Sequence, residues 1–302
     1  MAGLYDNFDA SKQIRLFTNI SFLDDHDQGL ICGSLQVVNA IETQRQYIAL
    51  SYAWGRPEEK SAVLIDGHIV MVPTSLVSFI EMLKIKYQIN ELKFWADAIC
   101  IDQSNRVEKA IQVRNMKSIF ENASQVLAWL GPQDCDGQVA MVMVKKILAH
   151  HSAQDKMSDS TDLVLSVVAG ALEFMNLKHG EPFDVEPYDA LYRFVTIPWW
   201  SRAWIKQEAS TETITALFCG EDYLTRTEMF IVAHYARTIF EEINHQWKCN
   251  SSVKRYEHRM MRRMLNRMFA LCTLHGYRKF AELDALPTSA LAILEYVRNS
   301  EC

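Results

Sequence analysis

Glycine and proline are scarce in this chain, with 11 and 7 residues among 302. Hydrophobic residues make up 49% of the chain and charged residues 23%. These proportions exclude collagen-like, low-complexity and intrinsically disordered chains, which are rich in glycine and proline or poor in apolar residues. The length corresponds to one large domain or two small ones, at roughly 100–200 residues per domain, and suffices for a sizeable core.

No two cysteines follow the C-x-x-C spacing of many zinc and redox sites. The seven cysteines are odd in number and scattered along the chain. We therefore expect neither a disulfide framework nor a metal site, and reduced thiols favour a cytoplasmic location. The adjacent pair His150-His151 does not predict a metal site either, because neighbouring side chains face different directions.

Long apolar runs and an excess of positive charge are also absent. No run reaches the ~20 residues that a membrane-spanning helix needs, and the segment Met1–Gln13 is too polar for a signal peptide. The 31 Lys and Arg residues against 37 Asp and Glu give a net charge of −6, which disfavours binding to nucleic acid or anionic lipid. We therefore expect no nucleic-acid partner and no stable insertion into a membrane.

The common phosphate-binding and nucleophile motifs are missing as well. The sequence contains no Gly-Lys-Ser/Thr, no G-x-G-x-x-G and no G-x-S-x-G. Nothing in it therefore indicates a P-loop, a Rossmann dinucleotide site or an α/β-hydrolase nucleophile. We expect no resident cofactor.

What the first half of the chain does contain is an alternation of strand and helix patterns. Apolar runs predict strands at 47–53, 63–65, 69–72, 94–101 and 126–130. Asp66-Gly67 is typical of a hairpin turn. Helices are expected to begin at Pro73 and at Asn105, each followed by apolar residues at helical spacing. This alternation predicts an α/β domain whose mostly parallel sheet is flanked by helices.

The second half reads as mainly helical. Helices are expected at 139–150, 163–177, 227–245 and 253–275, with one strand at 213–219. We therefore predict one α/β domain over 13–220, a helical insertion at 133–197 and a helical C-terminal extension over 221–302. The basic helix 254–268 is interpreted as a solvated face over a Met-rich core edge, with a membrane-surface or partner-binding helix as the alternative.

The first segment that can carry chemistry is Ala49–Gly55. It places Ser51, Trp54 and Gly55 at the carboxyl end of a predicted strand. In open α/β sheets, ligands bind outside those strand ends. The alternative interpretation is a buried strand that ends in a glycine turn.

The second segment is Trp95–Gln103, followed by Glu108. Asp97 interrupts an apolar run, where a carboxylate costs several kcal/mol unless it is paired or hydrogen-bonded. It is either a structural hydrogen-bonding group or a site residue. Asp102 can cap the loop after the predicted strand, and Asn105-x-x-Glu108 resembles a capping box. Each acid thus has a structural interpretation beside a functional one.

The third segment, Pro198–Glu208, holds three tryptophans and Arg202. Trp204 and Glu208 are four residues apart, so they share a helix face. A carboxylate beside an indole, with an arginine nearby, suits a partly desolvated acid that binds a polar or cationic ligand. The alternative is an aromatic core plug with a glutamate on the surface.

Taken in this order, the three segments resemble the fungal heterokaryon-incompatibility (HET) domain over about residues 13–220. The matching segments are Tyr47–Gly55, Trp95–Gln103 and Trp200–Glu208, with Ile14–Phe17 before them, Glu108-Lys109, Gln112-Val113, Met116 and Ala123–Gly131 between them, and Cys219-Gly220 after them. The chain departs from the family pattern at Asp102, where Asn is frequent, and at Ala53 and Ala203, where larger residues are common. The usual Asp-Pro-Arg-Asp-Lys segment is not recognisable around Phe280–Pro287.

The resemblance implies a fungal effector of cell death and allorecognition. Such an effector would act in innate immunity through programmed cell death. HET domains are regarded as remote relatives of TIR domains, which have a flavodoxin-like sheet. TIR enzymes cleave the nicotinamide–ribose bond of NAD with one helical glutamate. Ser201, Trp204 and Glu208 look similar to the sequence around that glutamate, with Ile205 in place of a cysteine.

The resemblance therefore implies an NAD glycohydrolase, with NAD or a related nucleotide as substrate. We expect Glu208 and Glu108 as the catalytic candidates, because a carboxylate stabilises the oxocarbenium-like centre of glycosidic cleavage. The expected substrate-binding residues are Ser51, Trp54, Gly55, Asp97, Asp102, Arg202 and Trp204. We also expect a homo-oligomer on activation and a partner signalling protein. The alternatives are a non-enzymatic module that acts by self-association or partner binding, and a hydrolase or transferase acting on another nucleotide or on nucleic acid.

Overall fold

The computed structural model describes residues 3–23, 29–132, 135–155, 193–194, 197–202 and 214–247. These residues form two compact units. The first, here called the sheet unit, comprises Met1–Pro132 and Arg202–Tyr223. The second, the helical unit, takes its described residues from 133–201 and 224–302. The domain limits drawn from the sequence stay a prediction.

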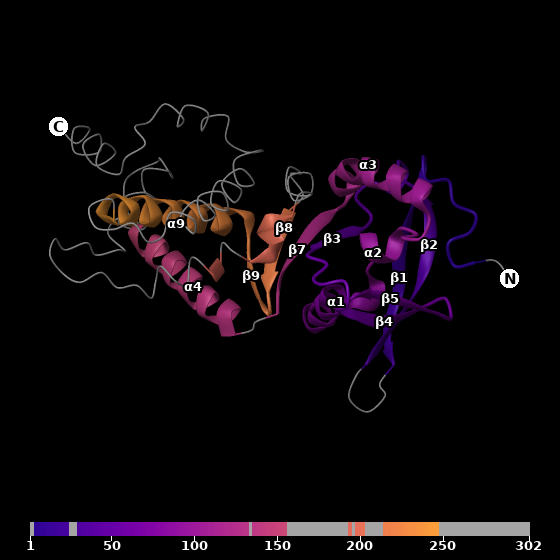
Figure 1. Cartoon of the computed structure of the whole chain (residues 1–302), viewed down its shortest axis with the longest axis horizontal. Helices are drawn as coiled ribbons and strands as arrows, with labels where there is room; N and C mark the ends of the chain where they lie inside the picture. Colours follow the sequence, from indigo (N-terminus) through magenta and orange to yellow (C-terminus); the bar gives the residue numbers. More distant parts are fainter. Residues whose placement is uncertain are drawn as a thin grey trace. The chain divides into compact units, whose positions relative to one another are not determined.

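Nine strands form one sheet in the order β5-β4-β2-β1-β6-β3-β7-β8-β9 (Figure 1). The strands are β1 (Gln13–Leu23), β2 (Leu30–Asn39), β3 (Ile48–Tyr52), β4 (Lys60–Ile65), β5 (His68–Pro73), β6 (Phe94–Trp95), β7 (Gln125–Gly131), β8 (Ile214–Cys219) and β9 (Asp222–Leu224). The helices are α1 (Thr74–Lys86), η1 (Ile89–Glu91), α2 (Asp97–Cys100), α3 (Arg106–Asn122), α4 (Cys135–Asp155), α7 (Pro198–Ser201) and α9 (Arg226–Trp247).

The α/β class is confirmed, but the sheet is mixed rather than mostly parallel. β6, β3, β7 and β8 run parallel to one another, and β2 runs parallel to β4, whereas β1 is antiparallel to both β2 and β6, and β4 is antiparallel to β5. Residues 24–29 join β1 to β2, which is too short for the crossover that a parallel pair requires. A flavodoxin-like sheet is all parallel, so the TIR-like topology is not confirmed.

Helices α1 and α3 cover opposite faces of the parallel strands (Figure 1). Phe79 of α1 stacks on Trp129 of β7 with ring centroids 5.2 Å apart. On the other face, Phe120 of α3 meets Trp95 of β6 edge-on, with centroids 5.4 Å apart. The predicted helix starts and the Asp66-Gly67 hairpin are confirmed. Because both faces of the sheet are covered here, all five residues of β3 are buried, as expected for a parallel strand with no solvent-facing side.

The predicted strand 94–101 is wrong beyond its first two residues. β6 ends at Trp95, and the chain turns into the four-residue helix α2, in which Ile101 N–H bonds the Asp97 carbonyl. A short apolar run fits a buried strand and a buried helix equally well. Asp97 therefore begins a helix and does not interrupt a strand.

Strand β2 was not among the predicted strands, and it contains Gly33, a residue type that weakens a strand interior. The glycine is needed there: a Cβ atom at Gly33 would lie 2.4 Å from the Phe17 ring of β1. In the helical unit, α4 and α9 confirm two predicted helices. The helices expected at 163–177 and 253–275, the latter holding the basic stretch, lie outside the described residues.

Two features are absent from the part of the chain that the structure describes. None of its helices is both long enough and apolar enough to cross a membrane. The same residues contain no group of three or more His, Cys, Asp or Glu side chains placed to hold a metal ion.

Candidate functional site

Most of the predicted site residues of the sheet unit lie at the carboxyl ends of two neighbouring parallel strands. Ser51 and Tyr52 end β3, with Trp54 and Gly55 directly after them. Asp97 follows β6, the strand that pairs with β3 through Ala49 and Trp95. Because the carboxyl ends of parallel strands share one edge of a sheet, the topology brings these side chains together.

Asp97 is held by two side chains from the end of β3. Tyr52 donates its hydroxyl hydrogen to Asp97 Oδ1 over 2.6 Å, and Trp54 Nε1 donates to Oδ2 over 2.9 Å. Both carboxylate oxygens of Asp97 therefore accept a hydrogen bond within the protein. The sequence expectation that a half-buried carboxylate must be hydrogen-bonded is thus confirmed, and its partners are now identified.

Tyr52 fixes this arrangement from inside the core. It is 1% exposed, and its hydroxyl oxygen also accepts a hydrogen bond from Ala98 N–H at 3.3 Å. Burial raises the pKa of Tyr52 well above its ordinary value, and the neighbouring charge of Asp97 raises it further. The phenol therefore keeps its proton and remains a donor to Asp97 at any physiological pH.

Trp54 presents part of its indole to solvent. The residue is 39% exposed although its Nε1–H is bound to Asp97. The Lys109 ammonium of α3 lies 6.0 Å from the ring centroid, at the outer limit of a cation–π contact. An exposed ring with a fixed orientation is suited to stacking against a flat ligand.

The turn after β3 directs this indole. Gly55 has a φ of +72°, a left-handed conformation that other L-residues rarely adopt. A Cβ atom there would also lie 2.8 Å from Glu59 Oε2. Ser75 at the start of α1 donates its hydroxyl to the Ala53 carbonyl. The predicted glycine turn is confirmed, and it serves to hold Trp54.

Ser51 and Arg202 are also brought together. Arg202 Nη1 donates to Ser51 Oγ at 3.3 Å, and the Arg202 charge lies near enough to Tyr52 to oppose the rise of its pKa. A guanidinium is a strong ligand for phosphate and carboxylate groups. This edge of the sheet therefore combines an aromatic face with cationic side chains.

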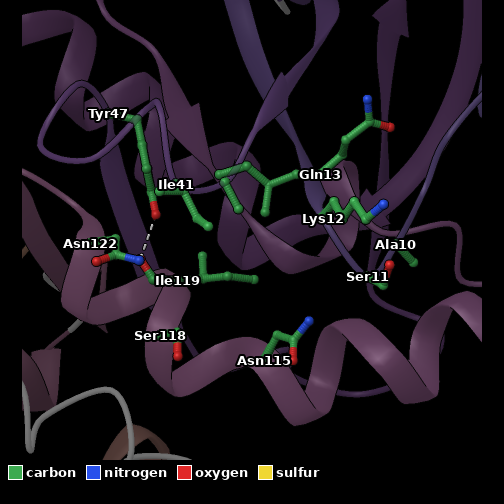
Figure 2. Close-up of a pocket in the computed structure, with 12 residues that line it drawn as sticks. Ala10, Ser11, Lys12, Gln13, Ile41, Tyr47, Asn115, Ser118, Ile119 and Asn122 are labelled. Carbon is green, nitrogen blue, oxygen red and sulfur yellow. Dashed lines mark hydrogen bonds between the residues drawn. The ribbon is translucent and has the colours of Figure 1, made fainter.

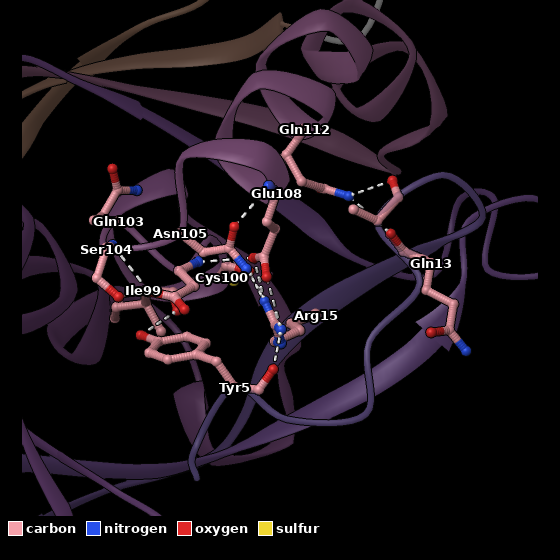
Figure 3. Close-up of polar contacts among 12 residues, drawn as sticks. Tyr5, Gln13, Arg15, Ile99, Cys100, Gln103, Ser104, Asn105, Glu108 and Gln112 are labelled. Carbon is pink, nitrogen blue, oxygen red and sulfur yellow. Dashed lines mark hydrogen bonds and ion pairs between the residues drawn. The ribbon is translucent and has the colours of Figure 1, made fainter.

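Glu108 lies in a different environment, a buried ion pair with Arg15 (Figure 3). Arg15 Nη1 is 2.5 Å from Glu108 Oε1 and Nη2 is 3.1 Å from Oε2, so the pair is bidentate. The Arg15 and Glu108 side chains are 1% and 7% exposed. Asp102 N–H donates to the same Oε1 at 2.8 Å. These contacts account for Glu108 in structural terms, and its catalytic role stays a prediction.

Of the predicted capping box Asn105-x-x-Glu108, the Asn105 cap is confirmed and the return bond from Glu108 is not. Asn105 Oδ1 accepts from the N–H groups of Val107 and Glu108, as an N-cap residue should. The Glu108 carboxylate does not return to Asn105, since Arg15 offers it charge-assisted bonds. Asp102 Oδ1 accepts from the backbone and hydroxyl of Ser104, which matches the predicted loop capping.

The ion pair and Asp97 are linked through the segment 97–103. Arg15 Nη1 contacts the Cys100 carbonyl at 3.3 Å, and Gln103 Nε2 donates to the Asp97 carbonyl at 2.7 Å. The segment that carries Asp97 is thereby anchored at both ends. Sequence reasoning missed Arg15 and Tyr52, and the signal was available: each is a polar group inside an apolar strand, which must find a partner.

Trp204 and Glu208 lie outside the described residues, so their placement beside Trp54 or Asp97 stays a prediction. A hollow of about 280 Å³ is lined by the residues that lead into β1, by Ile41 after β2, by Tyr47 before β3 and by α3. Ile41 and Ile119 face it from opposite walls, with Asn115, Ser118 and Asn122 along α3 (Figure 2). Among the predicted site residues that the structure describes, none lines this hollow.

Comparisons with known proteins bear on the same residues. A family model described as "Heterokaryon incompatibility protein (HET)" matches residues 47–208, which include β3, α2, α3 and Glu208. The chain is 27% identical over 263 residues to "Heterokaryon incompatibility protein 6, OR allele" of Neurospora crassa. That match covers 79% of this chain and 38% of the relative, so the chain spans well under half of the relative's length. No solved structure matches significantly.

Proposed function

Because this chain belongs to the heterokaryon incompatibility (HET) family, we propose that it is a fungal allorecognition and cell-death effector that hydrolyses the nicotinamide–ribose bond of NAD. The observation that carries the proposal is the ordered aromatic and charged edge at the end of β3. There Asp97 fixes the indole of Trp54, a residue that is 39% exposed, and Arg202 donates a hydrogen bond to Ser51. An aromatic face with nearby cations suits a nucleotide, which joins flat rings to phosphates.

The chemistry assigns separate tasks to these residues. Trp54 stacks on a ring of the substrate, and Arg202 binds a phosphate. Glu208 stabilises positive charge on the ribose C1′ as its bond to the nicotinamide nitrogen breaks. The electron pair of the broken bond leaves with nicotinamide, which becomes neutral, and water adds to C1′ and releases a proton to solvent to give ADP-ribose. Asp97 orients Trp54 and is a positioning residue, because both of its oxygens are already bonded within the protein.

A second candidate function is a non-enzymatic signalling module, and one observation favours it. Of the two glutamates nominated for catalysis, the described one is committed to Arg15 and to the Asp102 backbone. A glutamate in a buried bidentate pair needs no catalytic role to explain its presence. In that case cell death follows from self-association or partner binding, and NAD is left intact.

The purified chain tests these alternatives directly. NAD is incubated with wild type, Glu208→Gln and Glu108→Gln under dilute and crowded conditions, and nicotinamide and ADP-ribose are quantified by chromatography. We expect wild type to release both products in equal amounts and Glu208→Gln to lose at least a hundredfold in rate, in the range of losing one electrostatic stabiliser. Intact NAD in every sample would reject the enzymatic proposal. An unchanged rate for Glu208→Gln would reject that residue.

A further inference from the structure

The indole of Trp54 is held in a setting that makes it selective for positive charge. Its ring carries a negative face, as every indole does. Its Nε1–H donates to the Asp97 carboxylate over 2.9 Å. A hydrogen bond to an anion pushes electron density into the ring, and the carboxylate adds its own negative field beside it. Both effects strengthen attraction for a cation and do nothing for a neutral ring.

The arrangement is rigid enough to act as a recognition surface. Tyr52 binds the other oxygen of Asp97 over 2.6 Å, and Gln103 binds its backbone carbonyl. The carboxylate therefore cannot turn away from the indole when a ligand arrives. A preorganised contact of this kind loses little entropy on binding.

The protein already places one cation at this ring. The Lys109 ammonium lies 6.0 Å from the Trp54 centroid on an exposed, flexible side chain. At that distance the contact is weak, so a flat cation that lies directly against the ring can displace it. Lys109 then becomes available to the negatively charged part of the same ligand.

We propose that Trp54, with Asp97 bonded to its indole nitrogen, is a binding site for a flat aromatic cation of the pyridinium class. The inference deepens the proposed function and rests on it for the biological ligand, because the nicotinamide ring of NAD is such a cation. The inference also predicts that the site binds the substrate more tightly than the product. The ring is positively charged before the glycosidic bond breaks and neutral afterwards, so the site favours substrate over the released nicotinamide.

Two small probes that differ in charge test the site without any reaction. N1-methylnicotinamide is a pyridinium cation, and nicotinamide is the neutral ring of nearly the same shape. Affinities for every variant are measured by isothermal titration calorimetry. In the wild-type chain, labelled with ¹⁵N, the Trp54 indole N–H resonance, which the Trp54→Leu spectrum assigns, shows whether the probe binds at this residue. We expect the cation to bind about fivefold or more tightly than the neutral ring, the ratio that ~1 kcal/mol of cation–π attraction produces.

Three variants and two matched controls assign the preference to these residues. Trp54→Leu should abolish binding of both probes, and Asp97→Asn should reduce the preference toward one. Lys109→Gln should tighten binding of the small cation, since it removes a competing charge. Tyr223→Leu replaces another exposed aromatic residue beside a lysine, and Lys117→Gln alters another lysine of α3. Both controls should leave the affinities unchanged. Circular dichroism of every variant separates a lost site from a lost fold.

The outcomes separate this inference from the proposed function. Equal affinity for the two probes, no binding of either, or a preference that survives in Trp54→Leu overturns the inference, even if the chain consumes NAD. A charge preference that depends on Trp54 and Asp97 supports it, even if NAD proves to be left intact.

Discussion

Arg15 and Glu108 are 93 residues apart in sequence and form a buried bidentate ion pair, with Nη1 and Oε1 2.5 Å apart. The pair joins β1 to α3 across the segment 97–103. Tyr5 and Phe8 lie against the guanidinium, with ring centroids 4.9 and 3.7 Å from Cζ. The N-terminal segment thus covers the pair and completes its burial. Arg15 of this pair also donates to the Cys100 carbonyl, so the ion pair anchors the segment that carries Asp97, the residue that orients Trp54.

Breaking the pair should destabilise the sheet unit strongly. Glu108→Gln or Arg15→Met leaves a buried group without its counter-charge, and we expect a loss of about 3–5 kcal/mol in the free energy of unfolding. Urea titration followed by circular dichroism measures it. The control is Glu121→Gln, which breaks the exposed pair Lys117–Glu121 and should cost below about 0.5 kcal/mol. A small loss for Glu108→Gln would contradict the structural account of Glu108.

Removing the Tyr52 hydroxyl should loosen Trp54 without touching it. Tyr52→Phe keeps the ring in the core but deprives Asp97 Oδ1 of a donor and Ala98 N–H of an acceptor. We expect about 1–3 kcal/mol of destabilisation and a shifted, broadened Trp54 indole N–H resonance. Tyr47→Phe is the matched control, because its hydroxyl bonds the Ile119 carbonyl at the far end of β3. An unperturbed Trp54 resonance in Tyr52→Phe would show that the Tyr52 hydrogen bond to Asp97 is not needed to orient Trp54.

Stability of the helical unit should fall in acid because of His234. Burial, together with the smaller effect of the Arg237 charge, lowers the pKa of His234 to about 3. Between pH 6.5 and 3 the unfolded chain binds a proton there that the folded chain does not, so stability decreases as the pH falls through that window. His234→Gln should flatten the dependence in urea titrations at pH 7, 5.5 and 4.5. The exposed His68→Gln should not. If the free energy of unfolding of His234→Gln falls as steeply with decreasing pH as that of wild type, other groups cause the effect.

Local structure was predicted well from the sequence where a pattern of neighbouring residues is compatible with only one conformation. The Asp66-Gly67 hairpin, the buried face of α1 and the Asn105 cap depend on neighbours in the chain. The strand–helix boundary at Trp95 and the antiparallel placement of β1 depend on contacts with distant residues, so a single sequence left them open. The same holds for the site: Asp97 was recognisable as a buried acid that needs partners. That those partners are Tyr52 and Trp54 follows only from the pairing of β3 with β6.

Cellular NAD and cell death, measured together in one culture, test the central claim most directly. The chain is expressed from an inducible promoter in a fungal host, as wild type, Trp54→Leu, Glu208→Gln and the control Tyr223→Leu, at matched protein levels. We predict that NAD falls before viability does in wild type and Tyr223→Leu. The NAD level and the viability of the culture should both be preserved in Trp54→Leu and Glu208→Gln. Death of the wild-type culture with NAD unchanged would contradict the account and favour the non-enzymatic module.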